Sequence, residues 1–117
     1  IQKVIKFMFS KGCNYKNMTV AIGPSIVMQN YEVKNEFRNK FIKKSKKNFI
    51  FFTYKKSKIY FNLPNYVKTQ VKLSKIKNID ILNIDTFNKK NNFFSARRSL
   101  KLKHDDYGRN ISIIMIN

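Results

Sequence analysis

The sequence contains few of the residues from which self-contained catalytic and metal sites are usually built. Its 117 residues include one cysteine, one histidine, three glycines and no tryptophan. The single Cys13 excludes an internal disulfide framework, and the widely separated glycines exclude a glycine-rich phosphate loop. No Ser-His-Asp or Cys-His set can be recognised, so an enzyme that is complete within these residues is hard to build. No apolar run approaches the roughly 20 residues that a membrane-spanning helix needs, and the first residues lack the pattern of a signal peptide.

Acidic residues are scarce as well, and this leaves the chain strongly basic. Six Asp and Glu stand against 25 Lys and Arg, which gives a formal charge of +19 and a pI near 10.2. Such an excess favours an RNA- or DNA-binding module, because every neutralised phosphate releases counterions. A second explanation competes with it. Lysine, asparagine and isoleucine use codons made mostly of A and T, so an AT-rich genome raises the lysine content without selection for a ligand.

The length and the apolar content predict one folded domain. A chain of 117 residues has the usual size of one domain. Its hydrophobic content of 43% is higher than that of chains whose high net charge keeps them disordered. The sequence opens on Ile1, without an initiator Met and in the middle of an amphipathic pattern. We therefore expect a truncated chain.

Hydrophobic spacing predicts the first elements. Apolar residues recur every three to four positions over residues 1–11, which indicates a helix that Gly12 caps. The apolar run 18–22 predicts a buried strand that Gly-Pro ends. Fourfold spacing of apolar residues predicts a helix over residues 33–44.

The second half of the sequence predicts more strands than helices. "NFIFFTY" and "KIYFNL", separated by "KKSK", are typical of a hairpin, and Asn62 followed by Pro64 is typical of a helix start. Residues 79–84 predict a strand, and the apolar run 111–116 predicts a central strand covered on both faces. The fold class that this order predicts is α/β, a mixed sheet with flanking helices in one domain.

Arginine is concentrated near the end of the chain. The 25 basic residues include only four arginines, Arg38, Arg97, Arg98 and Arg109. Three of them lie close to the aromatic pair in "NFFSARRS". Arginine offers a planar fork of donors that fits carboxylate or phosphate and also stacks on aromatic rings, so this end could hold an anionic or aromatic ligand.

A structural reading of the same residues stays open. Phe93 and Phe94 could anchor a loop to the core while the arginines pair with aspartates. The candidate aspartates are Asp85, Asp105 and Asp106. His104 stands beside the last two, but three consecutive donors in a loop cannot all face one ion, so we interpret them as an exposed polar turn.

Four stretches in register resemble the laccase-domain family. They are "AIGPSI" followed by "YEV" at 21–33, "FNLPNYVKTQ" at 61–70, "DTFNKKNNFFSARRS" at 85–99 and "YGRNIS" at 107–112. The family has a Gly-Pro-x-Ile turn before Tyr-Glu-Val, a Phe-Asp-Leu-type helix start, then Phe-Phe-Ser-Tyr-Arg-Arg, then Gly-Arg before a last apolar strand. Residues 1–117 thus resemble a single partial laccase-type domain, its C-terminal portion. The family is also described as multicopper polyphenol oxidoreductase, purine nucleoside phosphorylase and peptidoglycan editing factor.

The resemblance implies a cytoplasmic bacterial enzyme that acts on purine nucleosides. Its implied reactions are phosphorolysis of adenosine, inosine and methylthioadenosine, and deamination of adenosine, at a zinc site that is also described as a copper site. By the same resemblance, Arg97, Arg98, Arg109 and Phe94 are the candidate substrate-binding residues, for a purine nucleoside and phosphate. No catalytic residue is predicted.

This sequence departs from the family where the metal is expected. The family's ligands are two His and one Cys, and the first His lies in a His-Ala-Gly-Trp motif that belongs before residue 1. The turn 25–30 contains no Cys, and residues 34–48 contain no His. Ala96 also replaces the usual Tyr of the arginine motif. We therefore expect no metal bound by this chain alone, weak activity or none, and an N-terminal half on a separate chain as a candidate partner.

Overall fold

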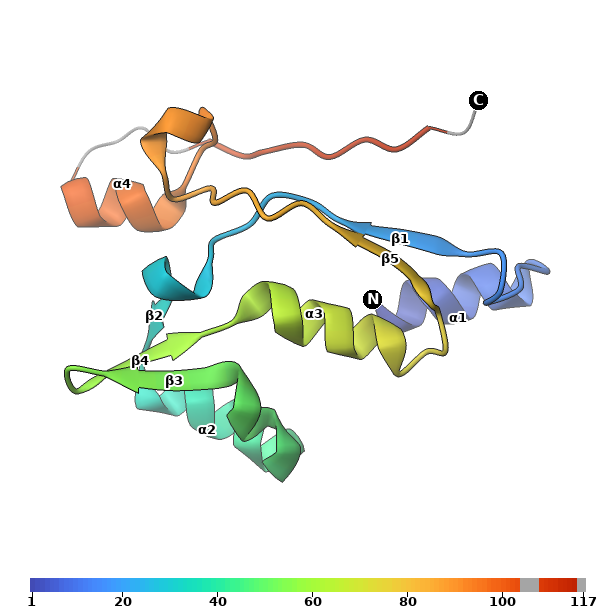
Figure 1. Ribbon diagram of the computed structural model, residues 1–117, viewed down its shortest axis with the longest axis horizontal. Helices are drawn as coiled ribbons and strands as arrows, with labels where there is room; N and C mark the ends of the chain where they lie inside the picture. The colour runs from blue at the N-terminus through green and yellow to red at the C-terminus, as the bar shows by residue number, and fades with distance from the viewer. Residues whose placement is uncertain (104–107, 116–117) are drawn as a thin grey trace.

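The fold combines a parallel and an antiparallel sheet with packed helices (Figure 1). The computed structural model describes residues 1–103 and 108–115. In those residues the helices are α1 (Gln2–Ser10), α2 (Asn35–Lys44), α3 (Leu63–Lys72) and α4 (Ala96–Leu102), with 3-10 turns η1 (Met28–Asn30), η2 (Lys46–Phe51) and η3 (Lys89–Asn91). The strands are β1 (Thr19–Ile22), β2 (Glu32–Val33), β3 (Phe52–Lys55), β4 (Lys58–Phe61) and β5 (Asn78–Ile81). The α/β prediction is confirmed.

The first core lies under the parallel pair β1–β5. Val20 pairs with Ile79, and Ile22 pairs with Ile81, so the apolar residues of both strands share one face. Helices α1 and α3 cover that face. The buried residues of this core are Ile5, Met18, Val71 and Ile76. The opposite face, formed by Thr19, Ala21, Asn78 and Asp80, is exposed.

The second core lies under the antiparallel sheet, whose strand order is β2-β4-β3. Phe61 of β4 is only 1% exposed and stands at its centre. The rings of Phe37 and Phe41 on α2 meet it at centroid distances of 5.3 and 4.9 Å. Ring pairs at these tilted or edge-on angles contribute more to the stability of the fold than the burial of their apolar area alone. This aromatic cluster holds α2 against the sheet.

Helix α3 connects the two cores. Its start was predicted correctly, since the Asn62 side chain accepts a hydrogen bond from the backbone N–H of Asn65 at 3.2 Å. Near that end Tyr66 packs on Phe61 in the second core, and near the other end Val71 is fully buried in the first. The two sheets are therefore joined by one rigid element.

Several boundaries differ from the sequence-based predictions. Val33 lies in β2 and not in the second helix, although it reaches the same core as Phe37 and Phe41. The predicted hairpin is present, but residues 46–51 form a 3-10 turn before β3 begins. Helix α4 was not predicted. Its only clear sequence signal is Ser95, whose hydroxyl accepts a hydrogen bond from the N–H of Arg98.

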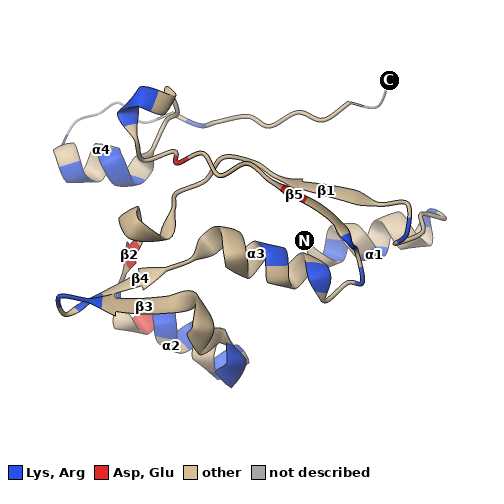
Figure 2. Cartoon of the chain, viewed as in Figure 1, with Lys and Arg blue, Asp and Glu red and all other residues tan. Residues whose placement is uncertain are grey.

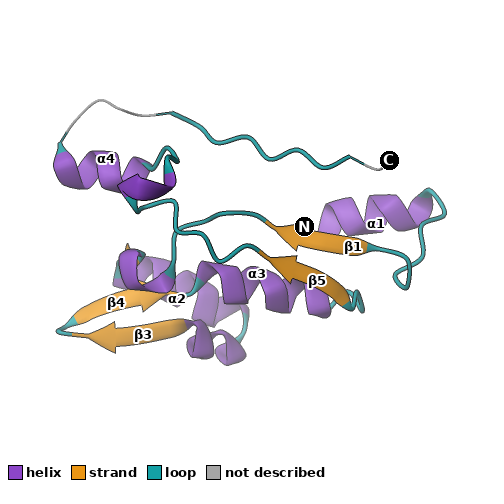
Figure 3. Cartoon of the chain, turned by 45° about the horizontal axis from the view of Figure 1, so that its top comes forward, coloured by secondary structure: helices purple, strands orange, loops and turns teal. Residues whose placement is uncertain are grey.

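The prediction of a doubly covered final strand is wrong for the residues that the structure describes. Residues 108–115 form an extended segment that passes Gly23 but joins neither sheet (Figure 3). Ile111 is 85% exposed and Met115 is 80% exposed. A central strand needs a hydrogen-bonded neighbour on each side and cover on both faces, and neither is present around this segment. His104, Asp105 and Asp106 lie outside the described residues.

The molecule is flat for its length. Its radius of gyration is 16.2 Å, whereas a globular domain of this size has about 13 Å. The exposed side chains of α1 agree with this, because Val4 and Phe7 are each 62% exposed and only Ile5 of the predicted apolar stripe is buried. Within the described ranges, none of the helices combines the length and the apolar character that crossing a bilayer requires.

The β3–β4 turn generates a stability prediction. Lys56 and Ser57 both have positive φ, 47° and 61°, a conformation that favours Asn-Gly in two-residue hairpins. Replacing both, with Lys56→Asn and Ser57→Gly, is expected to raise the free energy of unfolding by about 1 kcal/mol, because side chains other than Asn and Gly are strained there. Urea denaturation measures the gain. Ser57→Ala keeps the strain and should bring none, so an equal gain from that control would contradict the explanation.

Candidate functional site

The carboxylate of Asp85 joins two segments that are distant in sequence, residues 27–30 and the loop 85–87. One oxygen accepts hydrogen bonds from the backbone N–H of Val27 at 3.2 Å and of Phe87 at 3.0 Å. The other accepts from the side-chain amide of Asn30 at 2.7 Å. Ser25 pairs with Asp85 in a parallel bridge that continues the β1–β5 ladder. The loop after β5 is therefore fixed against the η1 turn.

Arg98 secures the same loop from the side of α4. Its guanidinium donates hydrogen bonds to the carbonyl oxygens of Thr86 at 3.0 Å, Phe87 at 3.1 Å and Phe93 at 2.6 Å. All three contacts are partly buried. Three of the guanidinium N–H donors of Arg98 are thus engaged within the protein, and its substrate-binding role stays a prediction.

Phe94 is engaged with the C-terminal segment. The side-chain amide of Asn110 donates to the carbonyl oxygen of Phe94 at 2.9 Å and accepts from its N–H at 3.0 Å. A Cβ on Gly108 would lie 2.5 Å from the Phe94 ring, so only glycine allows this approach. The ring is 46% exposed and lies outside the cleft described next.

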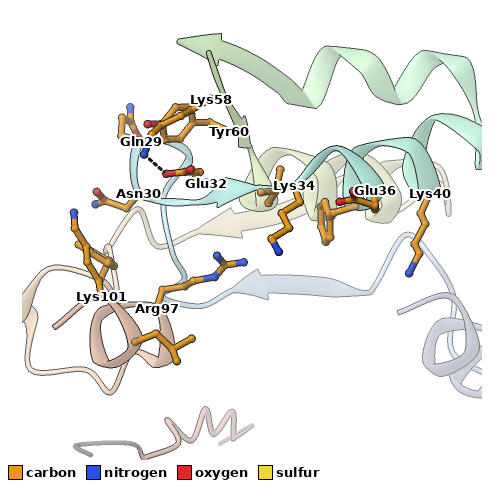
Figure 4. Close-up of a pocket in the computed structure, with 14 residues that line it drawn as sticks. Gln29, Asn30, Glu32, Lys34, Glu36, Lys40, Lys58, Tyr60, Arg97 and Lys101 are labelled. Carbon is orange, nitrogen blue, oxygen red and sulfur yellow. Dashed lines mark hydrogen bonds and ion pairs between the residues drawn. The ribbon is translucent and has the colours of Figure 1, made fainter. Parts of the chain in front are cut away.

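A cleft of about 830 Å³ opens between α4, η1, β2, β4 and α2 (Figure 4). Five cations and two carboxylates line it, together with aromatic rings and side-chain amides. The lining residues are Gln29, Asn30, Glu32, Val33, Lys34, Glu36, Phe37, Lys40, Lys58, Tyr60, Phe87, Arg97, Leu100 and Lys101. Because Asp85 and Arg98 hold α4 and η1 in place, they also determine the shape of this cleft.

Arg97 is the predicted site residue that reaches the cleft. Its guanidinium carbon lies 5.2 Å from the centre of the Tyr31 ring, a cation–π contact that leaves the N–H donors available. Adjacent residues of a helix point about 100° apart, which explains why Arg97 faces the cleft while Arg98 faces the loop. Arg109 is exposed on the C-terminal segment and is not among the residues that line the cleft.

The Glu32–Lys58 pair neutralises part of the cleft. The two side chains form an ion pair at 2.9 Å across the β2–β4 ladder, each about half exposed. The hydrogen bond and charge of Glu32 raise the pKa of Lys58 above its ordinary value near 10.5. A raised lysine pKa stabilises the fold at pH values below the ordinary pKa, and this stabilisation is lost as the pH rises through the raised pKa. The pair therefore keeps its contribution to stability throughout the neutral range.

Sequence reasoning missed most of the residues that line the cleft. Lys34 directly follows the Tyr-Glu-Val motif, and this was the one signal that could have indicated it. Lys58 and Tyr60 lie in a strand predicted only for its apolar pattern. Their approach to α4 depends on the Asp85 contacts, which no local pattern in the sequence indicates.

The described residues do not form a site for the family's expected metal. Among residues 1–103 and 108–115, no group of three or more His, Cys, Asp or Glu side chains could hold a metal ion. In the turn where the family's cysteine was expected, the side-chain amide of Asn30 donates a hydrogen bond to the carboxylate of Asp85. Cys13 is free and exposed in the loop between α1 and β1.

Removal of the Asp85 carboxylate tests its role as the junction. Asp85→Ala leaves two backbone donors and the Asn30 amide without their acceptor, so the free energy of unfolding should fall by about 2–3 kcal/mol. Asp80→Ala, at an exposed position with no hydrogen bond of its side chain among the described contacts, should change it by less than about 0.5 kcal/mol. Urea denaturation of both variants compares them. Equal losses would show that Asp85 has no special part.

The two adjacent arginines should differ in stability. Arg98→Gln removes the donors of three partly buried carbonyl oxygens and is expected to cost about 2–3 kcal/mol. Arg97→Gln removes only the contact with Tyr31 and should cost at most about 1 kcal/mol. Thermal and urea unfolding of the pair measure this difference. A larger loss for Arg97→Gln would contradict the assignment of the two side chains.

Comparison with known proteins identifies the family. The family model described as "Multi-copper polyphenol oxidoreductase laccase" matches residues 1–117. The chain is 31% identical over 113 residues to a purine nucleoside phosphorylase of Rickettsia conorii, covering 95% of this chain and 46% of that protein. It is 30% identical over 118 residues to a purine nucleoside phosphorylase of Rickettsia prowazekii, covering 99% of this chain and 48% of that protein. The chain thus spans about half the length of these curated relatives. The protein belongs to the multi-copper polyphenol oxidoreductase laccase family.

Proposed function

We propose that this protein contributes the substrate-binding cleft of a cytoplasmic purine nucleoside phosphorylase. The observation that carries the proposal is the cleft itself, in which Arg97 reaches a space lined by cations, amides and aromatic rings. Its volume of about 830 Å³ lies within the range of small-molecule sites. Two relatives named purine nucleoside phosphorylase support the substrate class.

The chemistry of the cleft suits this reaction. In phosphorolysis a phosphate oxygen forms a bond to C1′ of the ribose, the bond from C1′ to the purine nitrogen breaks, and the electron pair leaves with the base. A proton then neutralises the base, which departs beside ribose 1-phosphate. Cations are needed to hold the phosphate, and rings and amides to hold the purine. Both kinds of group line this cleft, as Arg97 and Lys34 on one hand and Phe87 and Asn30 on the other.

The proposal includes a second polypeptide. The chain covers less than half of each relative, and the described residues lack a donor set for the metal that the family description implies. The exposed apolar side chains of α1 and of residues 111–115 offer a surface for another chain. We propose that an N-terminal half carrying His-Ala-Gly-Trp covers this surface and supplies what the reaction still requires. Adenosine deamination and peptidoglycan editing, which the resemblance also implies, stay predictions.

A basic RNA- or DNA-binding module is the alternative. Lysine and arginine occur on every helix and at the β3–β4 turn (Figure 2). This alternative would require an affinity for nucleic acid that falls steeply with salt, roughly in proportion to the number of phosphates neutralised.

Two measurements test the proposed function. Titration calorimetry with inosine should detect binding to the 117-residue chain, while release of hypoxanthine from inosine and phosphate should be weak or absent. Co-expression with a family polypeptide that carries His-Ala-Gly-Trp should restore release. Failure of inosine to bind, either to the chain alone or to the co-expressed pair, would refute the proposal. Full turnover by the chain alone would refute the need for a second polypeptide.

A further inference from the structure

The cleft contains more positive charge than its own carboxylates can neutralise. Of its five cations, Lys58 is paired with Glu32. In the part of the chain that the structure describes, Lys34, Lys40, Arg97 and Lys101 form no ion pair, and Glu36 is the remaining carboxylate. Cations that share a water-filled hollow repel one another, and an anion between them relieves this repulsion. The electrostatics therefore favour an anionic ligand here.

Two of these cations are directed at the same space. Figure 4 shows the side chains of Arg97, from α4, and Lys34, from the end of β2, pointing toward one another across the cleft. Neither side chain donates a hydrogen bond to another described residue. The Tyr31 ring lies behind the guanidinium at 5.2 Å and holds it without using its N–H groups. Tyr31 is itself fixed by an edge-on contact with the Phe61 ring at 5.8 Å.

We propose that Arg97 and Lys34 form the phosphoryl subsite of this cleft, with the guanidinium fork binding two oxygens and the ammonium binding a third. This assignment rests on the proposed function and specifies which residues hold its phosphate. A guanidinium fork matches phosphate oxygens in a bidentate manner, whereas a lysine supplies a compact charge. The phosphoryl group could come from inorganic phosphate or from a nucleotide, and both offer the same chemistry to the two side chains.

The remaining lining includes groups that suit the nucleoside, among them the Phe87 ring, over which the Lys101 ammonium lies at 5.5 Å from the ring centre. Phe87 and the amide of Asn30 belong to the two segments that Asp85 joins, so they are held at a constant separation. An aromatic ring and a side-chain amide are groups that stack on and hydrogen-bond to a base. The anion is therefore assigned to the Arg97 side of the cleft and the purine to the Phe87 side.

Titration calorimetry on the 117-residue chain tests the subsite with three probes, namely inorganic phosphate, inosine and inosine 5′-monophosphate. Arg97→Gln and Lys34→Gln should each weaken the affinity for inorganic phosphate by roughly tenfold to a hundredfold, the loss of a charge-assisted hydrogen bond. The affinity for inosine should change by less than about twofold, because this ligand lacks the phosphoryl group. If inosine 5′-monophosphate binds more tightly than phosphate and both variants abolish that advantage, the phosphoryl group belongs to a nucleotide. If phosphate binds at least as tightly, inorganic phosphate is the source.

Lys77→Gln provides the matched control, because it removes one exposed lysine that does not line the cleft. It should leave phosphate binding unchanged within about twofold, which separates a specific subsite from attraction to the net charge of +19. Circular dichroism and the melting temperature confirm that each variant is folded. Unchanged phosphate affinity in both cleft variants, or an equal loss in Lys77→Gln, would overturn the subsite. If the chain does not bind inosine but the cleft variants lose phosphate binding, the subsite is supported and the nucleoside function is refuted.

Discussion

The candidate site depends on the carboxylate of Asp85, which accepts three hydrogen bonds. The two hydrophobic cores are built from separate segments, and the α4 region belongs to neither of them. The contacts that fix the α4 region are hydrogen bonds. Asp85 binds the η1 turn and the start of the following loop, and Arg98 binds three carbonyl oxygens of that loop. Without these contacts Arg97 would have no defined position relative to β2.

This arrangement separates the two arginines of one motif by function. Arg98 satisfies carbonyl oxygens that would otherwise be partly buried without donors, which is a structural task. Arg97, one residue earlier, is left free of such contacts and rests on Tyr31. The motif thus joins a residue that builds the cleft to a residue that faces it. Ala96, in place of the family's Tyr, is exposed and leaves both arginine contacts in place.

The sequence predicted those parts of the fold that depend on local signals. Apolar spacing indicated α1, Asn62 followed by Pro64 marked the start of α3, and two apolar runs around "KKSK" indicated the hairpin. Val33 was assigned to the wrong element because its spacing from Phe37 matches a helix, although its side chain reaches that core from a strand. Helix α4 was missed because it is short and is held by hydrogen bonds, so it lacks an apolar stripe. The cleft could not be predicted, since its lining comes from segments that meet only through Asp85.

Charge alone does not explain why this cleft would select phosphate. A chain with a formal charge of +19 attracts anions to much of its surface, and attraction between exposed groups is weakened by salt. A free lysine must also lose much of its rotamer freedom when it binds. Arg97 differs from the surrounding lysines because the Tyr31 ring already limits the positions of its guanidinium, and Phe61 limits those of Tyr31. Less entropy would then be lost on binding, so the proposed preference for phosphate depends on preorganised geometry rather than on the number of cations.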